Sequence, residues 1–203
     1  MADKRARDQL ARAAARFRAG LPALVLMTDD ERLPDPLAAA RALPRGSMVI
    51  LRARDTARRT QLAAALRSIA KAGGLKLLIA SDAALAARTG AHGIHLPHAR
   101  VKEAAHWRAR YPHWIITVAA HLPGAAVFVR QADAILLAPV FPTQSHPGEK
   151  TLGPIALRTI VRHAQTPIYA LGGVDRQTVR QLVGARLAGI AAIGALSPGS
   201  CGP

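Results

Sequence analysis

Cysteine is nearly absent from this chain of 203 residues, because Cys201 is its single example. One thiol beside the C-terminus excludes a disulfide framework and a cysteine-based zinc site. Apolar runs are short, and none approaches the roughly 18 residues that a membrane-spanning helix needs. The basic segment MADKRARDQLARAAARFRAG lacks the apolar core of a secretory signal, and Asp3 and Asp8 count against the alternative of an arginine-rich transit peptide. We therefore expect a cytoplasmic protein with no membrane partner.

Aromatic and acidic residues are also scarce. Phe, Trp and Tyr make up 3% of the chain, and 12 acidic residues oppose 28 Lys and Arg, which gives a net charge of +16. Such a charge attracts nucleic acid by counterion release. However, the arginines are spread along the chain, and few aromatic side chains are present to stack on bases. We therefore expect a phosphorylated small molecule, rather than nucleic acid, as the main partner.

Apolar segments recur at regular intervals, and most are continuously apolar, which is typical of strands buried on both faces of a parallel sheet. The eight segments are 23–28, 48–53, 75–80, 93–97, 114–120, 134–141, 167–173 and 189–196. Helical patterns separate them, at 35–43, 55–72, 82–90, 99–111, 122–131, 154–164 and 175–186. Helix-start signals stand at Asp82, Pro154 and Asp175.

Eight strands alternating with helices predict an α/β fold, a single-domain (β/α)8 TIM barrel. An open doubly wound sheet is the alternative, but no G-x-G-x-x-G motif follows the first strand. We place the barrel at residues 22–197, a helical N-terminal extension at 1–21 and a tail at 198–203. One face of the extension is apolar and carries Leu10, Ala14 and Phe17. A homodimer remains open.

Active sites of such barrels lie at the C-terminal ends of the strands, and the loops after strands seven and eight often bind phosphate. Gly172 and Gly173 follow the seventh strand, and Gly194 and Ala195 end the eighth. Glycine lets backbone N–H groups approach an anion closely. We therefore predict a phosphate site here, with a simple turn as the alternative for the paired glycines.

Arg52 and Arg54 are two residues apart in the second predicted strand, so both should point to the same side. Two arginines on one side of a buried strand need an anion, and we predict that both bind substrate phosphate. A solvated strand edge is the alternative.

His92, His95 and His98 have a spacing that suggests a metal triplet. Alternate positions of a strand face opposite sides, however, so the three rings cannot converge. His95 is better explained as a packed or site-lining residue. His121 ends the fifth strand and should stand at the mouth of the barrel.

The segment LLAPVFPTQSHPGEKTLGP, residues 136–154, runs from an apolar strand into a loop rich in hydrogen-bonding groups. Its prolines stiffen the loop and so preposition its donors. We predict that Thr143, Ser145 and His146 bind an anion. A well-capped turn is the alternative.

These segments together resemble the thiamine-phosphate synthase and thiazole tautomerase family over about residues 22–197. The matching motifs are MTD at 27–29, ILRAR at 50–54, GAHGIHL at 90–96, LAPVFPT at 137–143 and ALGGV at 170–174. The resemblance implies a (β/α)8 barrel. It also implies that Arg52, Thr143, Ser145, Gly173 and the strand-eight backbone hold phosphate or pyrophosphate.

The synthase branch of this family joins hydroxymethylpyrimidine pyrophosphate to thiazole phosphate, with Mg²⁺ on the pyrophosphate. The tautomerase branch shifts a proton on a carboxythiazole phosphate, and His121 matches the histidine that this branch uses for the transfer. No organic cofactor is implied. Arg52 and His121 are therefore the candidate catalytic residues.

This chain departs from the family pattern at several positions. The family's Gln and Lys around the first arginine are Ile50 and Arg54 here, and its Asn-Asp pair after strand three falls on Ala80 and Ser81. Its second metal aspartate falls near Arg100. Its serine after strand five is Ala119, and its lysine in the strand-six loop is His146. A hard cation prefers oxygen ligands, and Asp82, one place off, is the metal ligand that we nominate, with Asp29 and Asp30 nearby. We therefore expect weak Mg²⁺ binding. A divergent thiamine-phosphate synthase is the first interpretation, and a tautomerase-like isomerase or a non-catalytic binder of thiamine-related phosphates remains open.

Overall fold

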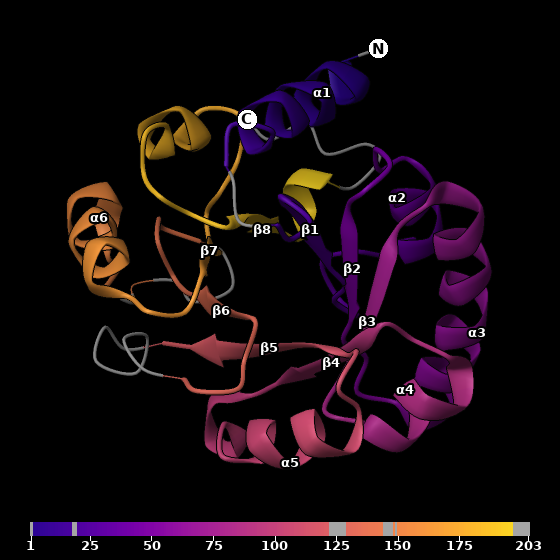
Figure 1. The fold of residues 1–203 in the computed structure, drawn as a ribbon. Coiled ribbons are helices and arrows are strands. Elements are labelled where there is room, and N and C mark those ends of the chain that lie inside the picture. Colours follow the sequence, from indigo (N-terminus) through magenta and orange to yellow (C-terminus); the bar gives the residue numbers. More distant parts are fainter. Residues whose placement is uncertain (1, 18–19, 122–128, 144–147, 149, 197–203) are drawn as a thin grey trace.

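The computed structural model describes residues 2–17, 20–121, 129–143, 148 and 150–196. Its strands form a closed parallel barrel in chain order (Figure 1). The strands are β1 Leu24–Met27, β2 Met48–Leu51, β3 Lys76–Ala80, β4 Gly93–Leu96, β5 Ile115–Ala120, β6 Ala134–Leu137, β7 Ile168–Ala170 and β8 Gly189–Ala192. Each of the eight apolar segments therefore contains one strand. The predicted (β/α)8 barrel is confirmed, and the open sheet is excluded because β1 pairs with β8.

Helices surround the ring of strands (Figure 1). They are α1 Ala2–Ala14, α2 Pro36–Arg41, α3 Thr56–Gly73, α4 Ala83–Thr89, α5 Glu103–Arg110 and α6 Gly153–His163, with 3-10 turns η1 His98–Arg100, η3 Thr178–Leu182 and η4 Gly194–Leu196. Asp55 and Asp82 cap α3 and α4 by accepting hydrogen bonds from backbone N–H groups three residues ahead. In the described part of the chain, no helix has the length and apolar character needed to cross a membrane.

The predicted helix at 175–186 is wrong, because the structure has only the short η3 turn there. The Asp175 carboxylate accepts from the backbone N–H groups of Gln177 and Thr178, both at 2.8 Å, and the Thr178 hydroxyl donates to the Gly173 carbonyl at 2.8 Å. Such local bonds from side chains to the backbone compete with an α-helix.

Two other predicted helices also need correction. The segment 99–111 is divided, because η1 precedes α5. Of the segment 122–131, only 129–131 belongs to the described residues, and none of these three is helical, with Gln131 at φ 75°. The prediction is therefore wrong at its C-terminal end, and the rest of it lies outside the described residues.

The core has two layers, because successive strand residues face opposite sides. The side chains that face inward fill the barrel with Val25, Met27, Met48, Ile50, Leu78, Ala80, Ala134, Leu136, Tyr169 and Ala191. The alternate residues face outward and pack against the helices. The predicted apolar face of the N-terminal helix is confirmed for Leu10 and Ala14, which are buried in this outer layer. Phe17 is buried there too, but it lies beyond the end of α1.

His95 on β4 lies in the interior of the barrel with 5% of its surface exposed. Its Nδ1 lies 2.9 Å from the hydroxyl of Thr117 on β5, so the two buried polar groups satisfy each other. Burial, together with the positive charge of Arg52, lowers the pKa of His95 to about 4. The ring is therefore neutral at physiological pH, and the prediction of a packed histidine is supported.

This burial predicts a dependence of stability on pH. An unfolded histidine has a pKa of about 6.5, so between that pH and about 4 the unfolded chain binds more protons than the folded one. The stabilisation is fully present above pH 6.5 and is lost as the pH falls through this window, at a rate of at most about 1.4 kcal/mol per pH unit. Urea unfolding should show that the free energy of unfolding falls less between pH 7 and pH 5 for His95→Asn than for the wild type. Equal differences would contradict the assignment.

Candidate active site at the mouth of the barrel

The C-terminal ends of β1 and β2 are joined by a buried hydroxyl. The backbone N–H of Arg52 donates to Thr28 Oγ1 at 2.8 Å, and the same hydroxyl donates to the Arg52 carbonyl at 3.1 Å. Because adjacent parallel strands end at the same mouth, this bond fixes the backbone from which Arg52 projects.

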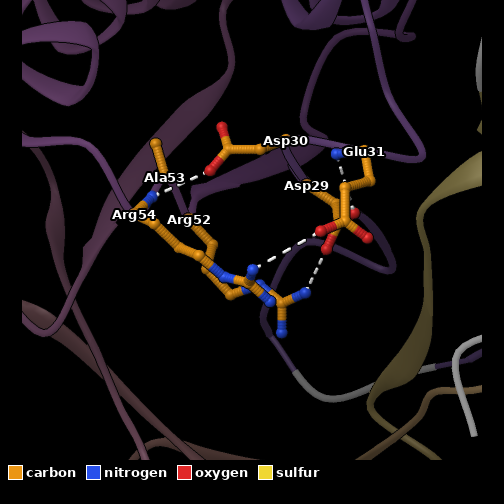
Figure 2. Close-up of a pocket in the computed structure, with 6 residues that line it drawn as sticks. All are labelled: Asp29, Asp30, Glu31, Arg52, Ala53 and Arg54. Atoms are coloured by element: carbon orange, nitrogen blue, oxygen red, sulfur yellow. Dashed lines mark hydrogen bonds and ion pairs between the residues drawn. The ribbon is translucent and has the colours of Figure 1, made fainter.

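The two strand ends border a small cavity of about 190 Å³ that is lined by charged side chains (Figure 2). Asp29 accepts ion-paired hydrogen bonds from Arg52 and, at 2.7 Å, from Arg32. Arg54 donates its backbone N–H to Asp30 at 2.9 Å, and its guanidinium lies 3.4 Å from Glu31. Carboxylates of the protein itself therefore hold both predicted anion-binding arginines.

Asp29 is the carboxylate that pairs with two arginines of this site, Arg32 and Arg52. Its partial burial would raise the pKa of the carboxyl, but hydrogen bonds from the side chain and backbone of Arg32 and from Arg52 outweigh burial and hold the pKa well below its usual range. Asp29 is therefore anionic at physiological pH. It keeps the Arg52 guanidinium oriented when no ligand is bound.

The structure corrects the prediction that Arg52 and Arg54 lie within a buried strand. Strand β2 ends at Leu51, and the side chains of Arg52 and Arg54 are 47% and 88% exposed. Their position beyond the strand makes both accessible to a ligand at the mouth. In the free protein, Asp29 provides the negative charge beside Arg52, and Glu31 provides it beside Arg54.

The glycines after β7 have a packing reason as well as a proposed binding role. Gly172 and Gly173 have φ of 88° and 64°, and a Cβ on Gly173 would lie 2.4 Å from the carbonyl oxygen of Pro142. The loop after β6 is bonded to them, because Val140 N–H donates to Leu171 and Phe141 N–H donates to Gly172. Only glycine therefore fits this contact between the two loops.

The segments that follow β7 and β8 carry backbone donors at the C-terminal ends of these strands. Within the described part of the chain, no residue accepts a hydrogen bond from the N–H groups of Gly172, Gly173 and Gly194. All three glycines are only half-buried, and they belong to the ends of neighbouring strands. Unpaired donors at this place are what an anion site requires.

The remaining predicted residues are only partly covered by the structure. Thr143 is half-buried in the loop after β6, and Ala195 lies in η4 beside Gly194. Ser145 and His146 lie outside the described residues, as does Cys201. His121 follows β5 directly and is exposed, so its place at the mouth is confirmed, whereas its catalytic role stays a prediction.

The nominated metal ligand is engaged in other contacts. Asp82 caps α4 through a 2.8 Å bond from Leu85 N–H, and its other oxygen lies 3.5 Å from Arg59. Among the described side chains, no three His, Cys, Asp or Glu lie together as a metal-binding group. The histidines do not converge either, since His92 accepts from the Leu77 N–H while His95 faces into the barrel. The donors at the ends of β3 and β4 therefore do not fit a divalent cation.

Several residues at the mouth were not predicted from the sequence. Arg32 and Glu31 complete the ion pairs of Asp29 and Arg54, and Arg59 and Glu103 hold the ends of β3 and β4. The signal was present for the first pair, because DDER follows the first strand and R-A-R follows its parallel neighbour. Opposite charges after adjacent parallel strands must meet at the same mouth.

The fold and the mouth define a (β/α)8 barrel protein with a charged site at the carboxyl ends of its strands. A family model described as thiamine monophosphate synthase matches residues 24–196. The chain belongs to this family, which confirms the resemblance seen in the sequence.

Curated relatives agree with this assignment. The thiamine-phosphate synthase of Chlorobium luteolum is 31% identical over 182 residues, which cover 87% of this chain and 85% of the relative. That of Thioalkalivibrio sulfidiphilus is 30% identical over 161 residues, with 75% and 76% covered. The solved thiamine phosphate pyrophosphorylase of Pyrococcus furiosus superposes with a TM-score of 0.72 at 21% identity over 88% of this chain and 89% of that one, a likeness of fold.

Proposed function

We propose that this protein is a transferase of thiamine biosynthesis that joins hydroxymethylpyrimidine pyrophosphate to thiazole phosphate and releases pyrophosphate. The observation that carries the proposal is the family match across all eight strands, together with relatives named thiamine-phosphate synthase that align over most of their length. The charged mouth supports it, because both substrates are anions.

The two halves of the mouth suit the two substrates differently. Arg52 and Arg54 after β2 supply full positive charges, which suit the more highly charged pyrophosphate. The N–H groups of Gly173 and Gly194, which have no acceptor among the described residues, suit the single phosphate of the thiazole, with Ala195 beside them. Thr143, Ser145 and His146 would complete the site from the loop after β6.

The reaction breaks the bond to pyrophosphate as the bond to the thiazole forms, so negative charge develops on the leaving group. Arginines that are already oriented stabilise such charge without reorganisation during the reaction. Arg52 is oriented in this way by Asp29 and by the Thr28 hydroxyl. The resemblance implies Mg²⁺ on the pyrophosphate, but the described side chains do not fit a resident cation, and no step is assigned to one.

Genetic complementation tests the proposed function. The gene should restore growth without thiamine to a strain that lacks thiamine-phosphate synthase, and it should not rescue a strain that lacks thiazole tautomerase. Rescue of the second strain alone would make the protein an isomerase. Rescue of neither strain, with the protein expressed and folded, would make it a non-catalytic binder.

His121 provides a prediction that separates the two enzyme interpretations. The exposed ring after β5 suits proton transfer, which favours the isomerase as the second candidate. In a synthase the histidine is not needed as a base, so His121→Gln should change kcat by less than about threefold in the coupling assay. A fall of roughly 10²–10⁴, the usual contribution of general acid–base catalysis, would contradict the synthase assignment.

A further inference from the structure

Arg100, in η1 after β4, is held close to the end of β3 by three hydrogen bonds. Its Nε and Nη2 donate to the two carboxylate oxygens of Glu103 at 2.6 and 2.7 Å, and its Nη1 donates to the Ser81 carbonyl at 2.9 Å. A guanidinium has five N–H donors, so these contacts leave two for a ligand. The charge of Arg100 is therefore fixed beside Ser81 and Asp82.

Arg59, in the first turn of α3, reaches Asp82, the residue next to Ser81. Its Nη2 lies 3.5 Å from Asp82, and its contacts with the Ala53 carbonyl and the Thr56 hydroxyl are 3.4 Å long. Its Nε is buried and has no hydrogen-bond partner in the described structure. A charged group with only long contacts and an unpaired buried donor destabilises the free protein unless a ligand satisfies it.

The two guanidiniums converge on consecutive residues, Ser81 and Asp82, next to the strand end that carries Arg52. The Asp82 carboxylate, which pairs with Arg59 and acts on Arg100 through its charge, already caps α4. A divalent cation would have to displace fixed positive charge from this place. A pyrophosphate would instead find donors with the planar geometry that matches phosphate oxygens.

We propose that Arg59 and Arg100 form a pyrophosphate subsite in which fixed guanidinium groups take the place of a resident divalent cation. The inference rests on the proposed function, since it concerns the pyrophosphate half of the same mouth. The ion pair with Glu103 holds Arg100 in position, and Arg59 gains a close acceptor, which none of the described residues offers it.

Binding of inorganic pyrophosphate to the full chain, measured by calorimetry, tests this subsite. Pyrophosphate should bind in the presence of EDTA, and millimolar Mg²⁺ should change Kd by less than about threefold. Arg59→Gln and Arg100→Gln should each weaken binding in EDTA by about tenfold or more, the scale of a charge-assisted hydrogen bond. Binding that requires Mg²⁺, or no binding at all, would overturn the proposal.

Arg67→Gln is the matched control. Arg67 lies two turns further along α3, beside Gly90 at the opposite end of the barrel, and its loss changes the net charge equally. Its Kd should stay within about twofold of the wild type, and an equal weakening would show a general charge effect and overturn the subsite.

A stability measurement separates binding from a structural role. Arg59→Gln should leave the Tm of the free protein unchanged or raised, because it removes an unpaired buried donor, whereas a structural arginine would lower Tm. If Arg100→Gln does not fold, the pyrophosphate affinity of Arg59→Gln in EDTA alone tests the subsite. Pyrophosphate binding in EDTA without genetic complementation would refute the synthase function and leave this subsite standing.

Discussion

Replacing Arg52 with alanine is expected to raise the KM for hydroxymethylpyrimidine pyrophosphate and lower kcat/KM by about 10- to 150-fold. The range follows from the 1.5–3 kcal/mol that a hydrogen bond to a charged group typically contributes, at about 1.4 kcal/mol per tenfold. Arg52 is already oriented in the free protein, because Asp29 holds its guanidinium and Thr28 holds its backbone.

The variant should fold normally. Asp29 keeps its second partner, Arg32, at 2.7 Å when Arg52 is removed, so no buried carboxylate is left unpaired. Steady-state kinetics and thermal unfolding measure the two effects separately.

Arg32→Ala is the matched control for Arg52→Ala. It removes an equal charge from the same carboxylate, but Arg32 does not line the cavity at the ends of β1 and β2. Its kcat/KM should change by less than about threefold. If the two variants lose activity equally, the role of Arg52 is to neutralise Asp29 and not to bind substrate.

Replacing Gly173 with alanine should destabilise the fold by about 2–5 kcal/mol. A non-glycine residue in the left-handed region costs roughly 1–2 kcal/mol, and overpacking a closed contact costs about 1–3 kcal/mol more. Both apply, since Gly173 has φ 64° and its Cβ would lie 2.4 Å from the Pro142 carbonyl oxygen. The loops after β6 and β7 would have to separate, so phosphate binding should weaken as well.

Two other glycines resolve these contributions. Gly184 has φ 85° but no atom within 4 Å of an added Cβ, so Gly184→Ala should show only the backbone cost. Gly194 has an ordinary φ and open space, so Gly194→Ala should change the free energy of unfolding by less than about 0.5 kcal/mol. Urea unfolding should show the largest loss of stability for Gly173→Ala, a smaller loss for Gly184→Ala and almost none for Gly194→Ala. A Gly173→Ala protein as stable as Gly194→Ala would contradict the close packing of Gly173 against Pro142.

The barrel could be predicted from the sequence because each strand is a continuous apolar run, and eight such runs separated by helical patterns leave few alternatives. The helix at 175–186 could not, because its pattern is helical while Asp175 and Thr178 bond locally to the backbone. Hydrophobic periodicity indicates which face of a segment is buried. It does not indicate whether side chains such as Asp175 and Thr178 will bond to the backbone and so prevent an α-helix.

The candidate site was predictable in part. The glycines and His121 could be placed at the mouth because residues after barrel strands meet there, and the arginine pair was proposed from its spacing of two residues, although it lies beyond the strand. The partners of Arg52 depend on which carboxylate its long side chain reaches, and Asp29 was considered only as a metal ligand. Arg59 was missed because it is one of two adjacent arginines at the start of α3, and only the structure shows that its Nε is buried.

The coupling reaction itself tests the central claim most directly. Purified protein would be incubated with hydroxymethylpyrimidine pyrophosphate and thiazole phosphate, and thiamine phosphate and pyrophosphate would be measured over time. We expect both products to appear in equal amounts and Arg52→Ala to slow their formation. Absence of thiamine phosphate while both substrates bind, or isomerisation of a carboxythiazole phosphate in its place, would contradict it.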